Sequence, residues 1–572
     1  MVQRILLLCS ADNGLTRRAR LALQRRGHRV RTAVVTDSAD IENAVAAADF
    51  DIVICPFLTA AIPASVYRRW WPNVVVIHPG PVGDRGPSSL DWAIHDQEIQ
   101  WGVIGLTATE QMDAGPIWAT RTFRLPADRR KSDIYNSVVA DAAVQIILEI
   151  ADKAADPTFE PVDQDQLCRP VPHARTRPLM RQTDRAFDWA DDPELILRRI
   201  RAGDGSPGVR SQIAGHSVYL HDAHPGRTVV NAPAGSVIGR RHHAIEIACG
   251  DHHSIWIGHL RADLGDRWSC KAPATTALGR AGFPIGSLPA TNPDVTTFRD
   301  ITYRVSADNL LGELTFRAYN GAMTTDLCRR LARAIRAAGR RNTRVLVIRG
   351  EVGTTFSNGL HLGAIELARD PAREAWRNIL AINAVCEEIL LSRNTVTIAA
   401  MTGSAGAGGP VMAQAADIVA VINRAVLDVH YRTMGLEGSE LQSLTLTRRV
   451  GAETAQRLLR ECAPIDTSEA LDIGLVDQVG PDIGFDTWLA ESAQEFTNTS
   501  RWEPAIRRKN AQLDRDLACR PLEAYTYSEL SRMADNLFND SLGFAAKRAE
   551  FMNKRTASRP LTTPQPVGIA IR

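Results

Sequence analysis

One histidine of this chain stands where a residue could do acid–base chemistry. His78 follows the apolar run 74–77 (VVVI), which predicts a buried strand because β-branched residues favour strands. The next residues, 79–86 (PGPVGDRG), contain prolines and glycines that prevent regular structure. Open α/β sheets place their chemistry at the carboxyl ends of strands, so His78 is a candidate catalytic residue. Taken alone, such a histidine is more often a hydrogen-bonded structural residue.

Asp113 is the candidate partner of His78. It follows a second predicted strand, residues 101–109 (WGVIGLTAT). If both strands belong to one parallel sheet, the two side chains converge at its carboxyl edge. Such a pair can protonate a leaving amine while the carboxylate orients the imidazole. Arg85 could hold an anionic part of a substrate, although a solvated surface position explains it equally well.

Two loops of small residues form a second constellation, residues 356–362 (FSNGLHL) and 403–410 (GSAGAGGP). Small residues let a substrate carbonyl approach two backbone N–H groups, which is the geometry of an oxyanion hole. Close packing of a helix on a strand would explain either loop alone.

A third segment, residues 430–440 (HYRTMGLEGSE), offers two groups that could move a proton. On one continuous helix, Tyr431 and Glu440 would point to opposite faces, because nine residues make about two and a half turns. Gly435 and Gly438 interrupt that helix, so the loop is predicted to fold back and bring both side chains to one pocket.

The elements that must position these residues suggest several domains. Alternating strand and helix patterns over 1–165 predict a mostly parallel sheet with helices on both faces, and G-x-G-x-x-G is missing after the first strand. Short strands between turns over 186–264 predict a small β-barrel, and 265–300 is Gly-, Pro- and Thr-rich, as linkers are. Residues 301–490 form another predicted α/β unit, and 491–572 are mainly helical.

Composition excludes several classes of protein. With 572 residues, 44% hydrophobic and 23% charged residues, and a net charge of +2, the chain is typical of soluble multidomain proteins and lacks a basic block for nucleic acid. We expect no signal peptide and no membrane span. Nine scattered cysteines suit a reducing cytoplasm, and no metal site is expected, because the histidine pairs 242–243 and 252–253 are interpreted as turn residues.

Residues 1–264 resemble the N10-formyltetrahydrofolate transferase/hydrolase family. The resemblance rests on segments 57–63 (FLTAAIP), 78–94 (HPGPVGDRGPSSLDWAI), 106–117 (LTATEQMDAGPI) and 246–251 (EIACGD). It implies that His78 and Asp113 are catalytic and that Val76, Arg85 and Gly86 are substrate-binding positions of the folate site. The family has an asparagine two residues before the histidine. This position is Val76 here, so the side-chain amide that would polarise the formyl oxygen is missing.

Residues 305–555 resemble the crotonase (enoyl-CoA hydratase/isomerase) superfamily. The resemblance assigns the oxyanion amides to Asn358 and Gly408. It implies coenzyme A binding by Gly359 and Gly409, and by Lys547 and Arg548 of the last helix. The two hydratase glutamates are replaced by Val411 and Tyr431, so addition of water to an enoyl-CoA is not expected. For the last helix, a solvated face is an equal alternative.

The combination, with the segments 356–366 (FSNGLHLGAIE) and 431–440 (YRTMGLEGSE), resembles the HypX/HoxX hydrogenase maturation family. The expected fold is therefore multidomain α/β: a formyltransferase-like parallel sheet, a small β-barrel, and a crotonase-like ββα domain with a helical C-terminus. The resemblance implies a cytoplasmic enzyme that makes carbon monoxide for [NiFe]-hydrogenase from N10-formyltetrahydrofolate and coenzyme A, with the hydrogenase or its maturation factors as partners. Either Glu440 takes the formyl proton or Tyr431 protonates the leaving sulfur.

Three alternatives remain at the level of the sequence. The chain could transfer formyl to an amine and carry a degenerate coenzyme A module. It could hydrolyse a coenzyme A thioester to formate. It could also be a maturation scaffold without catalytic activity, in which case His78 would be dispensable.

Overall fold

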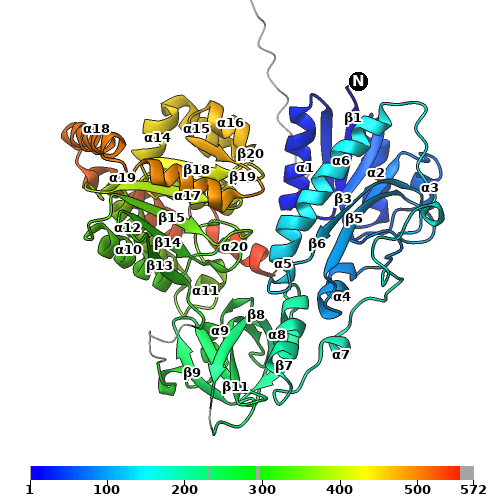
Figure 1. Ribbon diagram of the computed structural model, residues 1–572, viewed down its shortest axis with the longest axis horizontal. Helices are drawn as coiled ribbons and strands as arrows, with labels where there is room; N and C mark the ends of the chain where they lie inside the picture. The colour runs from blue at the N-terminus through cyan, green and yellow to red at the C-terminus, as the bar shows by residue number, and fades with distance from the viewer. Residues whose placement is uncertain (1, 230, 291–296, 554–572) are drawn as a thin grey trace, which may run out of the picture. The chain divides into compact units, whose positions relative to one another are not determined.

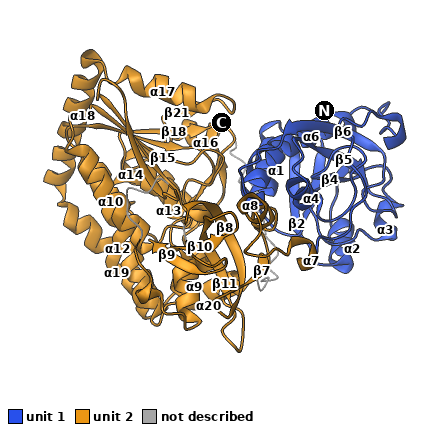
Figure 2. Cartoon of the chain, turned by 60° about the horizontal axis from the view of Figure 1, so that its bottom comes forward, with its two compact units in different colours: residues 1–181, 557–572 blue, residues 182–556 orange. Residues whose placement is uncertain are grey.

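The chain forms two compact units, residues 1–181 and residues 182–556 (Figure 2). The structure is a computed structural model that describes residues 2–229, 231–290 and 297–553. The formyltransferase-like sheet lies in the first unit, and the other predicted domains lie in the second. We describe each unit by itself.

The first unit is built on a six-stranded sheet of order β2-β1-β3-β4-β5-β6 (Figure 1). Its strands are β1 (Arg4–Cys9), β2 (Arg29–Val34), β3 (Ile52–Phe57), β4 (Val74–His78), β5 (Gln100–Thr107) and β6 (Ile117–Arg124). The first four are parallel, whereas β5 runs antiparallel to β4 and β6 antiparallel to β5. The sheet is therefore mixed, and His78 is the last residue of β4, one of its four parallel strands.

Helices cover this sheet. They are α1 (Gly14–Arg25), α2 (Ser38–Ala46), α3 (Ala64–Tyr67), α4 (Ser89–His95), α5 (Lys131–Ile134) and α6 (Ala140–Ala154). The segment Lys131–Ala154 is long and apolar enough to cross a membrane. Ile146, Ile147 and Ile150 of α6 are fully buried, however, and α6 packs on α1 and β6, which is the packing of a core helix.

The second unit begins with an antiparallel sheet of order β7-β8-β11-β10-β9, with β12 paired to β11. Its strands are β7 (Val209–Ile213), β8 (His216–Thr228), β9 (Val237–Arg241), β10 (Ala244–Cys249), β11 (His253–Ala262) and β12 (Ala272–Pro273). Helices α8 (Pro193–Ala202) and α9 (Ala274–Arg280) pack on it. Helix α9 lies within residues 265–300, which the sequence suggested as a linker, and its Ala274, Ala277 and Leu278 join the core of this sheet.

The rest of the second unit is the crotonase-like domain. Its main sheet contains β13 (Ile301–Val305), β14 (Leu311–Phe316), β15 (Val345–Gly350), β16 (Val396–Met401), β18 (Ile418–Ile422) and β21 (Gln478–Gly480). A small sheet contains β17 (Ala405–Gly406), β19 (Val426–Asp428) and β20 (Ile465–Asp466). Between the strands lie α10 (Thr325–Gly339), α11 (Leu362–Glu366), α12 (Pro371–Leu390), α13 (Gly408–Ala413), α14 (Thr445–Val450), α15 (Ala452–Glu461) and α16 (Thr467–Asp472).

Four helices follow: α17 (Phe485–Glu495), α18 (Thr499–Cys519), α19 (Leu522–Phe538) and α20 (Phe544–Asn553). The helices of this domain are amphipathic, so their apolar faces close one large core against the sheet. Leu331 and Ile335 of α10, for example, are fully buried. The predicted fold class, formyltransferase-like and crotonase-like α/β domains with a helical C-terminus, is confirmed.

Candidate active sites

The ring of His78 lies between two carboxylates at the end of β4. Its Nε2 is 2.8 Å from Oδ2 of Asp84, and its Nδ1 is 3.4 Å from Oδ2 of Asp113. The side chains of His78 and Asp84 are almost completely buried. The predicted approach of His78 and Asp113 is therefore present, and Asp84 is a second acidic neighbour that sequence reasoning missed.

The way in which Asp113 reaches His78 differs from the prediction. Strand β5 was expected to run parallel to β4, but it is antiparallel, and its end at Thr107 pairs with Val75 near the start of β4. The connection 108–116 must therefore turn back along β4. Asp113 has a φ of 55°, and its Oδ2 accepts a hydrogen bond of 3.0 Å from the N–H of Gly86. This bond ties the returning connection to the loop after His78.

Gly80 makes the contact between His78 and Asp84 sterically possible. A Cβ atom at Gly80 would overlap both Nε2 of His78 and Oδ2 of Asp84. Asp84 itself is placed by a turn, in which its N–H donates to the carbonyl of Pro81 at 3.0 Å. From the sequence, the glycines and prolines of this loop were interpreted only as residues that prevent regular structure. In the structure they also make room for the buried carboxylate of Asp84.

The two carboxylates determine the protonation of His78. Burial alone would lower the pKa of the imidazole, but the hydrogen bond with Asp84 and the charges of Asp113 and Asp84 raise it above its usual value. The imidazolium form therefore persists to higher pH than in a free histidine. A buried imidazolium between two carboxylates is suited to give a proton to a departing nitrogen.

Replacing Asp84 tests this electrostatic account. We expect Asp84→Asn to lower the pKa of His78, because the variant removes one negative charge and keeps a side chain of the same size. The pKa is measured by NMR titration of the histidine rings, with Asp165→Asn, which changes an exposed carboxylate of the same unit, as the control. An unchanged titration of His78 would contradict the proposed role of Asp84.

Val76 lies two residues before His78 and therefore on the same face of β4. It pairs with Leu106 of β5 and packs against an apolar cluster that contains Val82 and Ile104. The position that carries an asparagine in the formyltransferase family is thus part of an apolar wall beside His78. It offers no hydrogen-bond donor to a substrate.

Arg85 and Gly86 lie on the other side of the loop. Nη2 of Arg85 is 3.5 Å from Oε1 of Gln164, and the Arg85 carbonyl accepts from the N–H of Arg177 at 2.9 Å. Gly86 has a φ of 116°, and a Cβ there would overlap the carbonyl of Arg177. Packing therefore explains why residue 86 is a glycine. Substrate binding by the half-buried Arg85 stays a prediction.

The second constellation also comes together. The hydroxyl of Tyr431 donates to Oε2 of Glu440 at 2.7 Å, and both side chains are buried. A Cβ at Gly408, the first residue of α13, would overlap Oε1 of Glu440 and lie 3.2 Å from the Tyr431 hydroxyl. The predicted folding back of the 430–440 loop is confirmed, and both residues face the start of α13.

The backbone at Glu440 is strained. Glu440 and Leu441 have φ values of 64° and 59°, a region that non-glycine residues seldom adopt and that costs on the order of 1 kcal/mol or more for each residue. The N–H of Glu440 donates to Oδ1 of Asn383 at 2.9 Å, and the N–H of Ser439 donates to Oε2 of Glu440 at 3.0 Å. Such strain is typical of sites where the position of one side chain matters.

Helix α19 holds this loop in place. Glu529, Met533 and Asn536, which lie on one face of the helix, accept hydrogen bonds from the backbone N–H groups of Ser443, Gly438 and Glu437. Nothing in the local sequence of the loop points to these partners, which lie 86 to 99 residues later in the chain. The helical C-terminus therefore helps to build the second site.

Burial also shifts both pKa values of the pair. It raises the pKa of Glu440 above its usual value, and the hydrogen bonds from Tyr431 and Ser439 oppose this shift. The pKa of Tyr431 is raised well above its usual value by burial and by the adjacent Glu440 charge. Tyr431 therefore stays protonated as a donor to Glu440, and Glu440 is a stronger base than an exposed carboxylate.

The two predicted oxyanion amides are placed differently. Gly408 is the first residue of α13, where N–H groups have no partner within the helix. The N–H of Asn358, by contrast, donates to the carbonyl of Gly321 at 2.6 Å. The Asn358 amide is therefore not directed at a substrate position here, so a role in carbonyl binding requires a shift of this loop.

The glycines assigned to coenzyme A have packing roles. Gly359 has a φ of 70° and lies against the N–H of Gly408, with 3.4 Å between that nitrogen and a Cβ built on Gly359. A Cβ at Gly409 would overlap the carbonyl of Ser357. Both glycines let the 356–362 loop and α13 approach each other, which is the packing alternative considered from the sequence, and contact with coenzyme A stays a prediction.

Lys547 and Arg548 of α20 also differ from each other. Nε of Arg548 is 2.7 Å from Oε2 of Glu366, its side chain is only 9% exposed, and its guanidinium lies over the ring of Phe544. Nζ of Lys547 donates to the carbonyl of Leu542. Arg548 therefore joins α20 to α11, and the prediction that it binds coenzyme A is not favoured, whereas Lys547 stays a candidate.

Two alanine variants separate these roles. We expect Arg548→Ala to lower the free energy of unfolding by about 2 kcal/mol, because it leaves the carboxylate of Glu366 without its ion pair. Lys547→Ala should leave stability nearly unchanged and weaken coenzyme A binding. Denaturant unfolding and calorimetric titration with coenzyme A measure the two quantities, and a stable Arg548→Ala protein with lost affinity would contradict the assignment.

Comparison with known proteins agrees with both parts of the chain. Residues 179–276 match the family model "Formyl transferase, C-terminal domain", and residues 313–557 match "Enoyl-CoA hydratase/isomerase". The hydrogenase maturation factor HoxX of Bradyrhizobium diazoefficiens is 35% identical over 99% of this chain and 100% of its own length. This chain belongs to the HoxX family of hydrogenase maturation factors.

The similarity to a solved structure of this family extends over almost the whole chain. The crystal structure of HypX from Aquifex aeolicus in complex with tetrahydrofolic acid has a TM-score of 0.90 and 33% identity, covering 98% of both chains. A methionyl-tRNA formyltransferase of Roseiflexus castenholzii is 29% identical over 38% of this chain and 66% of its own length. The family resemblance inferred from the sequence is confirmed.

Proposed function

We propose that this maturation factor makes carbon monoxide from N10-formyltetrahydrofolate in two steps, and that the product becomes the CO ligand of the [NiFe]-hydrogenase active site. The first step transfers the formyl group to the thiol of coenzyme A. The second step releases CO from formyl-CoA and regenerates the thiol. Membership of the HoxX family and the tetrahydrofolic acid bound by the related HypX support the folate substrate and the role in maturation.

In the first step, the thiol ionises, its thiolate attacks the formyl carbon to form a sulfur–carbon bond, and the bond from that carbon to N10 breaks. The proton released by the thiol replaces the one that His78 gives to N10. His78 gives its proton to the departing nitrogen, and Asp113 and Asp84 hold the imidazolium in place. Because His78 has a raised pKa, transfer should slow as the pH rises through that pKa and the imidazolium is lost. A thiolate is a far better nucleophile than water, so an acceptor of this kind could dispense with the amide that Val76 lacks.

In the second step, Oε1 of Glu440 takes the proton from the formyl carbon. The carbon–sulfur bond breaks, CO leaves, and the proton passes to the thiolate of coenzyme A. The N–H of Gly408, beside Glu440, would bind the formyl oxygen, and Tyr431 would orient the carboxylate through its hydrogen bond. Both sites in one chain raise the effective concentration of the intermediate.

One observation carries the proposal: a buried carboxylate paired with a tyrosine hydroxyl faces the start of α13, although both hydratase glutamates are replaced. A degenerate binding module would need no buried, strained Glu440 at that place.

The experiment supplies the purified full chain with N10-formyltetrahydrofolate, with and without coenzyme A, and detects CO by its effect on haem absorbance. We expect CO only when coenzyme A is present. Formate in place of CO would indicate a thioester hydrolase, and formyl transfer to an added amine without CO would indicate an amine formyltransferase. No turnover of any kind, combined with hydrogenase maturation that survives His78→Ala, would indicate a scaffold.

A further inference from the structure

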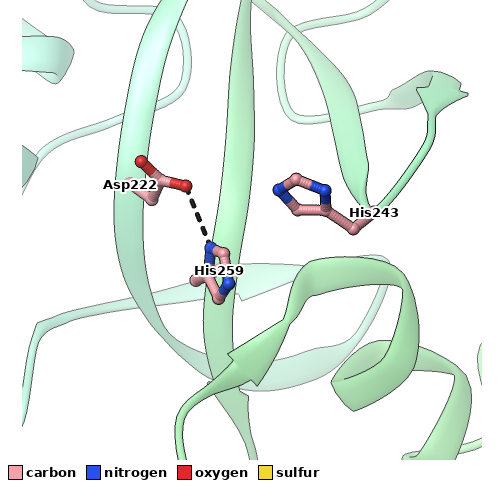
Figure 3. A group of neighbouring side chains, drawn as sticks. All are labelled: Asp222, His243 and His259. Carbon is pink, nitrogen blue, oxygen red and sulfur yellow. Dashed lines mark hydrogen bonds and ion pairs between the residues drawn. The ribbon is translucent and has the colours of Figure 1, made fainter. Parts of the chain in front are cut away.

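A chain of buried histidines crosses the second unit and ends beside the loop that carries Asn358 and Gly359. His259 lies on β11, Asp222 on β8, and His361 directly before α11. Nδ1 of His259 is 2.9 Å from Oδ2 of Asp222, and Nε2 of His259 is 3.1 Å from Nε2 of His361. Figure 3 shows His259 and Asp222 directed toward each other, with His243 beside them.

Only one arrangement of protons satisfies these contacts with neutral rings. Nδ1 of His361 accepts from the N–H of Ala364 at 3.1 Å, so the ring proton of His361 is on Nε2. His361 therefore donates to Nε2 of His259, which leaves the proton of His259 on Nδ1, from where it is donated to Asp222. Burial lowers the pKa of His259 to about 4 and that of His361 well below its usual value, so neutral rings are expected near pH 7.

At its other end, this series of hydrogen-bonded side chains also reaches the crotonase-like domain. Nε2 of His224 is 2.8 Å from the other oxygen of Asp222, and Nη1 of Arg317 is 2.9 Å from Nδ1 of His224. Arg317 directly follows β14, and His361 lies near the end of the small-residue loop 356–362. The β7–β12 sheet thus bridges two segments of the neighbouring domain, because its buried His224 and His259 form hydrogen bonds with Arg317 and His361.

Two contacts join this chain to the loop at the second site. The ring of His361 caps α11, and its backbone N–H donates to Oδ1 of Asn378 at 3.1 Å. The ring of Tyr319 stacks on His259 at 4.2 Å between centroids, and Gly321, two residues later, accepts the Asn358 N–H. The Asn358–Gly359 loop is therefore linked to His259 by two routes, one through His361 and the other through Gly321 and Tyr319.

A metal site is the competing explanation. The ligand atoms of Asp222, His243 and His259 lie within 4.8 Å of one another, and two histidines with one carboxylate suit zinc or iron(II). His243 was interpreted from the sequence as a turn residue, and its ring in fact lies inward, with its side chain only 13% exposed. Both nitrogens of His259 already have partners, however, so an ion on either nitrogen would displace a hydrogen bond of the chain.

We propose that His361 is a positioning residue of the second site, and that His259 and Asp222 hold it so that the Asn358–Gly359 loop keeps its packing against Gly408, whose N–H binds the thioester carbonyl. This inference rests on the proposed function for the identity of that carbonyl. It adds a task for the formyltransferase-like β7–β12 sheet, which is to support the geometry of the crotonase-like site.

The test uses His361→Asn, which keeps a side-chain oxygen to cap α11 but is too short to reach His259. We expect tetrahydrofolate release at the first site to be unchanged and the CO formed per tetrahydrofolate to fall about tenfold, as expected for a small displacement of a catalytic loop. The fall should appear in kcat and not in the KM for coenzyme A. His259→Gln should behave alike, and the double variant should be no worse than either single one.

His252→Asn, which changes an exposed histidine in the turn between β10 and β11, is the control and should resemble the wild type. Variants that make as much CO per tetrahydrofolate as the wild type, or losses that add in the double variant, would overturn the inference. So would stoichiometric zinc or iron in the purified protein that is lost in His259→Gln. If the wild type makes no CO, the proposed function fails. Calorimetry then tests the inference, because His361→Asn should bind acetyl-CoA more weakly than the wild type does and bind coenzyme A equally well.

Discussion

Glu440→Gln is expected to lower CO release by about a thousandfold, the range in which a positioned general base contributes to a rate. Glutamine keeps the size of the side chain and can still accept from the Tyr431 hydroxyl, but it cannot take the formyl proton. Because the raised pKa of Glu440 limits the ionised form at low pH, wild-type CO release should increase as the pH rises through that pKa.

The measurement is CO formed per tetrahydrofolate released, at saturating coenzyme A. Tyr431→Phe should be affected less than Glu440→Gln, because it removes only the orienting hydrogen bond. Glu437→Gln is the matched control, since Glu437 lies in the same loop and its carboxylate is half-exposed beside Arg532. A Glu440→Gln protein with wild-type CO yield would show that the base is another group, and a larger loss in Tyr431→Phe would favour protonation of sulfur by the tyrosine.

His78→Gln should have the second large effect, a loss of formyl transfer of about a hundredfold or more. Glutamine lacks the titratable proton that departs with N10, and it leaves Asp84 and Asp113 facing each other without the intervening cation. Tetrahydrofolate release measures this step directly, and CO should fall in the same proportion. The control is His173→Gln, in the same unit, whose side chain is 77% exposed.

An intact rate in His78→Gln would contradict the account of the first site. Loss of CO without loss of tetrahydrofolate release would also contradict it, because that result would assign His78 to a later step. The two variants together therefore separate the two steps: Glu440→Gln should preserve tetrahydrofolate release for at least one turnover, whereas His78→Gln should not.

Local sequence patterns predicted much of both sites. Glycines at 435 and 438 correctly indicated that the chain would fold back and join Tyr431 to Glu440, because a turn of that kind depends on nearby residues. The histidine at the end of β4 was predicted for the same reason. Asp113 was also predicted from its place after a strand, and the family motifs agreed, but the expected parallel strand was wrong, because β5 runs antiparallel to β4.

Contacts between distant segments could not be predicted. The direction of β5 depends on the path of the chain between β4 and β5, and the apolar pattern of β5 is the same in either orientation. Glu366, which neutralises Arg548, lies 182 residues away in the sequence, and His361 lies 102 residues from His259. Each of these side chains has an ordinary local sequence, so its role follows only from the packing of the domains.

The most direct test of the central claim follows the formyl carbon. The full chain is given N10-[13C]formyltetrahydrofolate with coenzyme A at a tenth of the folate concentration, and 13CO bound to haem and free tetrahydrofolate are both measured. We predict one 13CO for each tetrahydrofolate released, over several turnovers of the coenzyme A present. Tetrahydrofolate release accompanied by [13C]formate and no 13CO would contradict the account.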